Sequence, residues 1–207
     1  MSVKFPYLKK EELDQEQRRF WDFITLGERG FYTGGAAATR LPDLYNAWLQ
    51  FVPLGVAATG LGDEVRKRSA LPGKLRELVV LFTSARLGAR VEFDFHTPFA
   101  LDQGLSTELI EAIGRGERPE FQDDAERIVY EANMQLIGTG DLSSGTKREL
   151  VDLLGFNGMM QFVAAVSLYV INAYTTNIAN VKLAEDFSAD PDKLKRHYAG
   201  GRKNAES

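Results

Sequence analysis

Apolar residues recur at spacings of three and four along most of the chain, and strict alternation of apolar and polar residues is scarce. Spacings of three and four place apolar side chains on one face of a helix, whereas alternation indicates a strand. The pattern therefore predicts an all-α protein.

The periodic segments predict helices at these positions: residues 10–25, a helix beginning near Pro42, about 72–86, about 91–103, 107–116, 122–140, a short helix after residue 143, and about 157–181. Residues 26–42 are rich in glycine and are predicted to form a loop. Gly88 and Gly104 are expected to end helices, because glycine adopts the left-handed conformation found there. Pro98 predicts a bend or the start of a new helix, because proline cannot donate a backbone hydrogen bond.

These elements suggest three parts: an N-terminal helical extension (1–67) that packs on the core, a helical core domain (68–187) and a polar C-terminal tail (188–207). The most apolar window, residues 159–174, is shorter than the ~20 residues that span a bilayer. Gln161 and Asn172 also interrupt it. We therefore expect a helix that is buried in the core or against another subunit, and no membrane partner.

Composition narrows the classes of function. The formal net charge of the 207 residues is -4 and no long basic run occurs, which argues against nucleic acid as a partner. The chain has no cysteine, which excludes disulfides, thiolate zinc sites, iron–sulfur clusters and thiol catalysis. The N-terminus has no apolar signal-peptide core, so a cytoplasmic protein is expected.

The segment "RVEFDFH" holds Glu92 and His96, four residues apart. This spacing puts both side chains on one face of a helix, where a carboxylate can fix the tautomer of an imidazole. Such a pair suits general acid–base chemistry near neutral pH. From spacing alone, an ordinary i,i+4 pair on a helix surface is the more common interpretation, and general acid–base chemistry is the alternative. Asp94 falls about 160° away from His96 on a helical wheel and is expected to face elsewhere.

The preceding helix adds Glu77, which shares an apolar face. A helix reversal at Leu87–Gly88 could bring Glu77 back toward His96, giving a catalytic group of His96, Glu92 and Glu77. The same three side chains could ligate iron, manganese or zinc, but with a single histidine in the core no metal site is predicted.

Three arginines lie close to these residues in sequence. Arg86, Arg90 and Arg76 are the candidate residues for binding an anionic group of a substrate, although solvated or paired arginines remain the alternative.

The order of these residues resembles the carboxymuconolactone decarboxylase family of the AhpD-like superfamily. Glu77 is followed after eleven residues by Ala89, after two more by Glu92 and after three more by His96, and then by "ALDQGLSTELIEAI". Peroxidase members of that superfamily have a glutamate, a Cys-x-x-Cys pair and a histidine at this spacing. Residues 125–174 also resemble the later helices of the family, so that the resemblance covers about residues 68–187.

The resemblance implies an AhpD-like helical bundle with an N-terminal helical extension, and a homo-oligomer (dimer, trimer or hexamer). Ala89 and Glu92 occupy the positions of the two cysteines, so thiol peroxidase activity is excluded. Cysteine-free members resemble the decarboxylase branch, which needs no cofactor. The resemblance therefore implies a carbon–carbon lyase that acts on a small anionic unsaturated lactone or acid. An isomerase, hydratase or cyclase with the same acid–base pair, or a non-enzymatic oligomeric binding protein, are the alternatives.

Overall fold

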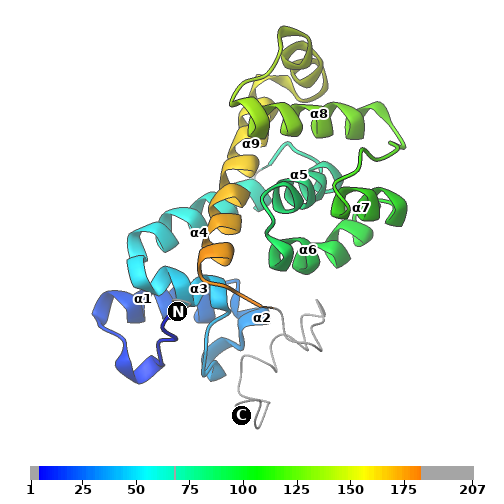
Figure 1. Cartoon of the computed structure of the whole chain (residues 1–207). Coiled ribbons are helices and arrows are strands. Elements are labelled where there is room, and N and C mark those ends of the chain that lie inside the picture. Colours follow the sequence, from blue (N-terminus) through cyan, green and yellow to red (C-terminus); the bar gives the residue numbers. More distant parts are fainter. Residues whose placement is uncertain (1–4, 68, 183–207) are drawn as a thin grey trace. The chain divides into compact units, whose positions relative to one another are not determined.

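The computed structural model describes residues 5–67 and 69–182, and every regular element within these ranges is a helix, which confirms the all-α prediction (Figure 1). The α-helices are α1 (Gln15–Leu26), α2 (Gly30–Thr33), α3 (Asp43–Trp48), α4 (Val52–Lys67), α5 (Gly73–Arg86), α6 (Arg90–Asp102), α7 (Thr107–Gly114), α8 (Asp124–Thr139) and α9 (Ser144–Ile178). Three short 3-10 helices accompany them: η1 (Lys10–Glu12) before α1, η2 (Gly35–Ala37) before α3, and η3 (Leu49–Phe51) before α4. The predicted tail, 188–207, and His197 lie outside the described residues.

The described residues divide into two compact units, one formed by 5–59 with 178–182 and the other by 60–177. The division falls within α4. The boundaries predicted from the sequence, at residues 67 and 187, remain predictions.

In the first unit, α1 contacts α2 and η2. The helix predicted to begin at residue 10 begins instead at Gln15, because the Asp14 carboxylate accepts a hydrogen bond from the Gln17 N–H (2.8 Å) and caps the helix there. Phe20 and Ile24 of α1 are buried, whereas Phe23 is 47% exposed. The predicted glycine-rich loop contains the single turn α2 and the short η2.

In the second unit, α5 is the central helix and packs against α6, α7 and α8. Four consecutive residues of α5, Leu78–Leu81, have no exposed surface, so this helix is buried on all sides. The buried Asn133 of α8 ties the two helices together, since its Nδ2 donates to the Val79 carbonyl at 3.1 Å.

Glycines end three helices of this unit in the same way. Gly88, Gly104 and Gly116 have φ between 68° and 89°, and follow α5, α6 and α7. After each, the next N–H donates to a carbonyl five residues earlier, as Leu105 does to Ala100 at 3.0 Å. The predicted ends at Gly88 and Gly104 are therefore confirmed. Helix α6 continues through Pro98, so no new helix begins there.

Helix α9 joins the predicted short and long helices, with non-helical backbone at Gly155 (φ 68°, ψ 174°). Among the described helices it alone has the length and apolar composition of a membrane-crossing segment. The core helix of a soluble protein meets the same criteria, and Phe162, Ala165, Tyr169 and Ala173 of α9 have no exposed surface.

Candidate active site

The reversal between α5 and α6 positions the candidate site. Ala89 N–H donates to the Ser84 carbonyl (2.8 Å) and Gly88 N–H donates to the Ala85 carbonyl (3.1 Å), which satisfies the last carbonyls of α5. Gly88 permits this turn because its φ of 68° is unfavourable for residues with a Cβ. Helix α6 therefore runs back along α5 and faces it, and the side chains of the two helices can meet.

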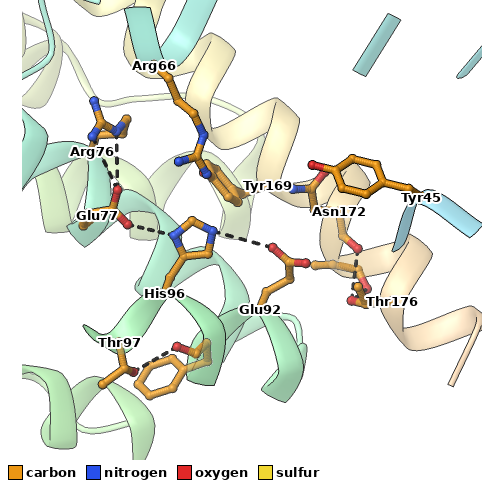
Figure 2. Close-up of polar contacts among 12 residues, drawn as sticks. Tyr45, Arg66, Arg76, Glu77, Glu92, His96, Thr97, Tyr169, Asn172 and Thr176 are labelled. Carbon is orange, nitrogen blue, oxygen red and sulfur yellow. Dashed lines mark hydrogen bonds and ion pairs between the residues drawn. The ribbon is translucent and has the colours of Figure 1, made fainter. Parts of the chain in front are cut away.

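His96 lies between two carboxyl groups (Figure 2). Its Nδ1 is 2.8 Å from Oε2 of Glu77 on α5, and its Nε2 is 4.0 Å from Oε2 of Glu92 on α6. His96 and Glu77 are each 2% exposed and Glu92 is 6% exposed. The predicted approach of Glu77 to His96 is confirmed, and the alternative of an ordinary surface pair at Glu92 and His96 is wrong.

The two carboxyl groups differ in their electrostatics. Burial acts to raise the pKa of Glu77, but the hydrogen bond to His96, the charge of His96 and the nearby guanidinium groups outweigh it, so the pKa of Glu77 is lowered. At Glu92, burial outweighs the favourable influence of His96, Asn172 and Arg66, and the pKa of the carboxyl is raised. The surroundings therefore act on the two glutamates in opposite directions, favouring the carboxylate at Glu77 and the protonated acid at Glu92.

This difference fixes the orientation of the imidazole proton. A carboxylate can only accept a hydrogen bond, so Nδ1 of His96 carries a proton and donates it to Glu77. Nε2 is then directed toward Glu92, at a distance too long for a direct hydrogen bond. The geometry presents Nε2 as the atom of His96 that can exchange a proton with a third group.

Helix α9 supplies an aromatic wall and two polar side chains. The Tyr169 ring stands perpendicular to the imidazole of His96, with 5.2 Å between centroids and 88° between planes. The hydroxyl of Tyr169 accepts a hydrogen bond from Nη2 of Arg66 at 2.9 Å. Asn172 acts to lower the pKa of Glu92, and its buried Oδ1 has no hydrogen-bond partner within the part of the chain that the structure describes.

The sequence analysis missed Arg66, Tyr169 and Asn172 as members of the site. One signal for two of them was present. Tyr169, Asn172 and Thr176 recur at helical spacing within the most apolar helix, which marks a polar strip on a buried face. No comparable signal marked Arg66, because its neighbours in sequence are also charged.

The arginines proposed from the sequence lie in different surroundings. Arg76 is partly buried and its Nε is 3.4 Å from Oε1 of Glu77. Arg90 is exposed and pairs with Asp94 at 2.8 Å, so Asp94 faces away from His96 as expected. Arg86 is exposed at the end of α5, and no polar contact within the described residues joins it to the acid–base group. Of the three, the structure brings only Arg76 to the site.

The surroundings of His96 favour proton transfer in a medium of low polarity. Phe95 and Phe99 lie with ring centroids 5.5 Å and 5.9 Å from the imidazole. Within residues 5–67 and 69–182, no group of three or more histidine, cysteine, aspartate or glutamate side chains is arranged to hold a metal ion. The arrangement is a linear carboxylate–imidazole–carboxyl row that can donate or accept a proton.

Comparison with known protein families gives a match over part of the chain. Residues 54–129 match the model of the carboxymuconolactone decarboxylase family, and this segment contains Glu77, Glu92, His96 and Arg66. No curated protein matches the chain. Residues 54–129 of this helical chain therefore match the carboxymuconolactone decarboxylase family.

Proposed function

We propose that the protein is a cofactor-independent, carboxymuconolactone decarboxylase-like carbon–carbon lyase. Its substrate is a small anionic unsaturated lactone or acid. The observation that supports this proposal is the buried row of Glu77, His96 and Glu92, in which one histidine separates two carboxyl groups of opposite pKa shift. The absence of cysteine leaves this row without a thiol relay.

In the proposed reaction, the bond between the substrate carbon and its carboxylate breaks and carbon dioxide leaves. The electron pair of that bond passes into the conjugated carbonyl system and forms a dienolate. His96 then delivers a proton from Nε2 to carbon, and solvent restores that proton before the next turnover. Atoms and charge balance with one proton taken up for each carbon dioxide released.

The two glutamates take different parts in this reaction. Glu77, as a carboxylate, accepts from Nδ1 and holds the imidazole with Nε2 toward the reacting atom. Glu92, when protonated, can relay the proton from solvent to Nε2 after His96 has delivered its own, and solvent then reprotonates Glu92. The perpendicular ring of Tyr169 keeps the imidazole plane fixed between them.

We further propose that the protein acts in the cytoplasm as a homo-oligomer, without nucleic acid or membrane as a partner. The net charge of -4 supports the absence of nucleic acid. Four apolar residues of α9 that are more than half exposed support self-association: Phe156, Met160, Tyr174 and Ile178. Uncharged apolar surface of this kind is commonly covered by another subunit.

The test is release of carbon dioxide from a panel of lactones and conjugated acids. Wild-type protein is expected to release carbon dioxide from at least one member, and His96→Ala is expected to lose turnover by at least ~100-fold, the usual scale for a positioned acid or base. Asp94→Asn, on the exposed side of the same helix, serves as the control and should retain turnover.

Two results would contradict the proposal. Unchanged turnover in His96→Ala would remove the assigned acid. Conversion of a panel member without carbon dioxide release would instead identify an isomerase, hydratase or cyclase that uses the same acid–base row.

A further inference from the structure

Arg66 brings a positive charge to the buried acid–base row from outside it. It lies in the last turn of α4, and the residue as a whole is exposed. Its Nη2 nevertheless donates to the hydroxyl of Tyr169, which has no exposed surface. Figure 2 shows the side chain reaching toward the Tyr169 and His96 rings. The side chain therefore extends from an exposed residue to a buried hydroxyl near the imidazole.

The positive charge of Arg66 acts on three acidic groups around His96. It acts to lower the pKa of Glu77, of Glu92 and of Tyr169. A cation that favours the anionic form of three neighbouring groups also favours an anionic ligand bound among them. Arg76, by comparison, lies directly against the carboxylate of Glu77.

Tyr169 is suited to act with Arg66. Burial, the largest influence, raises the pKa of its phenol, so the hydroxyl stays protonated at neutral pH. A hydroxyl that accepts from Arg66 can still donate its own proton to another oxygen. A guanidinium has five N–H donors and can bind a carboxylate through two of them while a third donates to a phenol.

We propose that Arg66 and Tyr169 form the anion-binding subsite of this protein, and that it takes the carboxylate of a small unsaturated acid next to His96. The Arg66 guanidinium binds the carboxylate, and the Tyr169 hydroxyl orients the guanidinium and donates to the same anion. This assignment differs from the arginines that sequence proximity suggested. The class of substrate rests on the proposed lyase function, whereas binding of a carboxylate does not require turnover.

The first experiment measures binding of fumarate, a planar unsaturated dicarboxylate, to the full-length protein by titration calorimetry. Wild type is expected to bind, and Arg66→Met is expected to weaken binding by about tenfold or more, the scale of a lost charge-assisted contact. Lys67→Met is the matched control, because it removes the neighbouring cation, which pairs with Asp63 at 3.6 Å. Its affinity should equal that of wild type.

Two further variants separate recognition from folding. Arg66→Lys keeps the charge but loses the planar fork, and it is expected to bind with intermediate affinity. Tyr169→Phe keeps the ring against His96 but loses the hydroxyl, and its effect should be non-additive with that of Arg66→Met, because the two residues act together. Thermal melting of each variant confirms that the fold is retained.

The subsite is overturned if wild type does not bind fumarate, or if Arg66→Met weakens binding no more than Lys67→Met does. Kinetics distinguish this failure from failure of the lyase proposal. Carbon dioxide release with an unchanged KM in Arg66→Met removes the subsite alone. Arg66-dependent fumarate binding without carbon dioxide release from any panel member supports the subsite and removes the lyase.

Discussion

Helix α6 carries two pairs of ionisable residues at the same spacing, Glu92 with His96 and Arg90 with Asp94, on opposite sides. Arg90 and Asp94 form an exposed ion pair, with 73% and 35% of their side chains accessible and 2.8 Å between Nε and Oδ2. Glu92 and His96 are almost fully buried and stand 4.0 Å apart. The exposed pair is the closer one.

The difference shows that distance does not measure the importance of a pair. In water, a surface ion pair is screened and contributes ~0.2–1 kcal/mol. Within the protein, desolvation raises the pKa of Glu92 and makes its protonation state depend on its neighbours. The buried pair is therefore the one suited to proton transfer, and three experiments test this contrast.

The largest effect on the free energy of unfolding is expected at Glu77, which contacts His96 on the buried side of α6. Glu77→Ala leaves the buried Nδ1 of His96 without its acceptor, and should lower the free energy of unfolding at pH 7 by about 3–5 kcal/mol. Asp94→Ala, on the exposed side, should lower it by less than ~1 kcal/mol. Urea unfolding of both variants measures the contrast.

The loss in Glu77→Ala should also depend on pH. Because the folded protein lowers the pKa of Glu77, the stabilisation is present above the ordinary glutamate value of 4.5 and is lost as the pH falls through the lowered pKa. Equal losses in the two variants, or a loss that grows below pH 4.5, would show that the Glu77–His96 contact is not what stabilises this side.

An effect of intermediate size on the free energy of unfolding is expected for Glu92→Gln, because glutamine mimics the neutral acid. Because the folded protein raises the pKa of Glu92, wild type loses stability as the pH rises from 4.5 through the raised value. The variant lacks this loss, so its free energy of unfolding relative to wild type should rise by about 1.4 kcal/mol per pH unit between 4.5 and the raised pKa.

Thermal melts between pH 4.5 and 8 measure this advantage, with Glu108→Gln, an exposed residue of α7, as the control. A constant difference between Glu92→Gln and wild type across that range would mean that Glu92 is not held as the neutral acid.

The smallest effect is expected on the exposed side of α6. A double-mutant cycle of Arg90→Gln and Asp94→Asn should give a coupling energy of about 0.3–0.5 kcal/mol, which decreases in high salt. A coupling above ~2 kcal/mol would erase the distinction between the two sides of the helix.

Much of the local structure could be predicted because it depends on neighbours in sequence. The helix ends at Gly88 and Gly104 follow from the conformational freedom of glycine. The shared face of Glu92 and His96 follows from the helical repeat. The exact start of α1 could not be predicted from periodicity. Asp14 caps the helix by accepting a hydrogen bond from the Gln17 N–H, so the helix does not extend toward residue 10.

Which residues form the candidate site was harder to predict from the sequence. Glu77 lies 19 residues from His96, and the expected reversal between two helices permitted their approach without deciding that Glu77 faces His96. Arg66 and Tyr169 are 103 residues apart, and no turn or spacing links them. The proximity of arginines in sequence pointed to Arg86 and Arg90, which the structure leaves at the surface of the second unit.

The sequence by itself determined an all-helical protein, its glycine-terminated helices, the absence of thiol chemistry and the shared face of Glu92 and His96. These properties depend on composition and on the helical repeat. Only the tertiary structure decided that the pKa of Glu77 is lowered and that of Glu92 is raised, and that Arg66 donates to Tyr169 beside them. The physical reason is that a pKa depends on desolvation and on charges brought close by packing, which residue type and spacing do not specify.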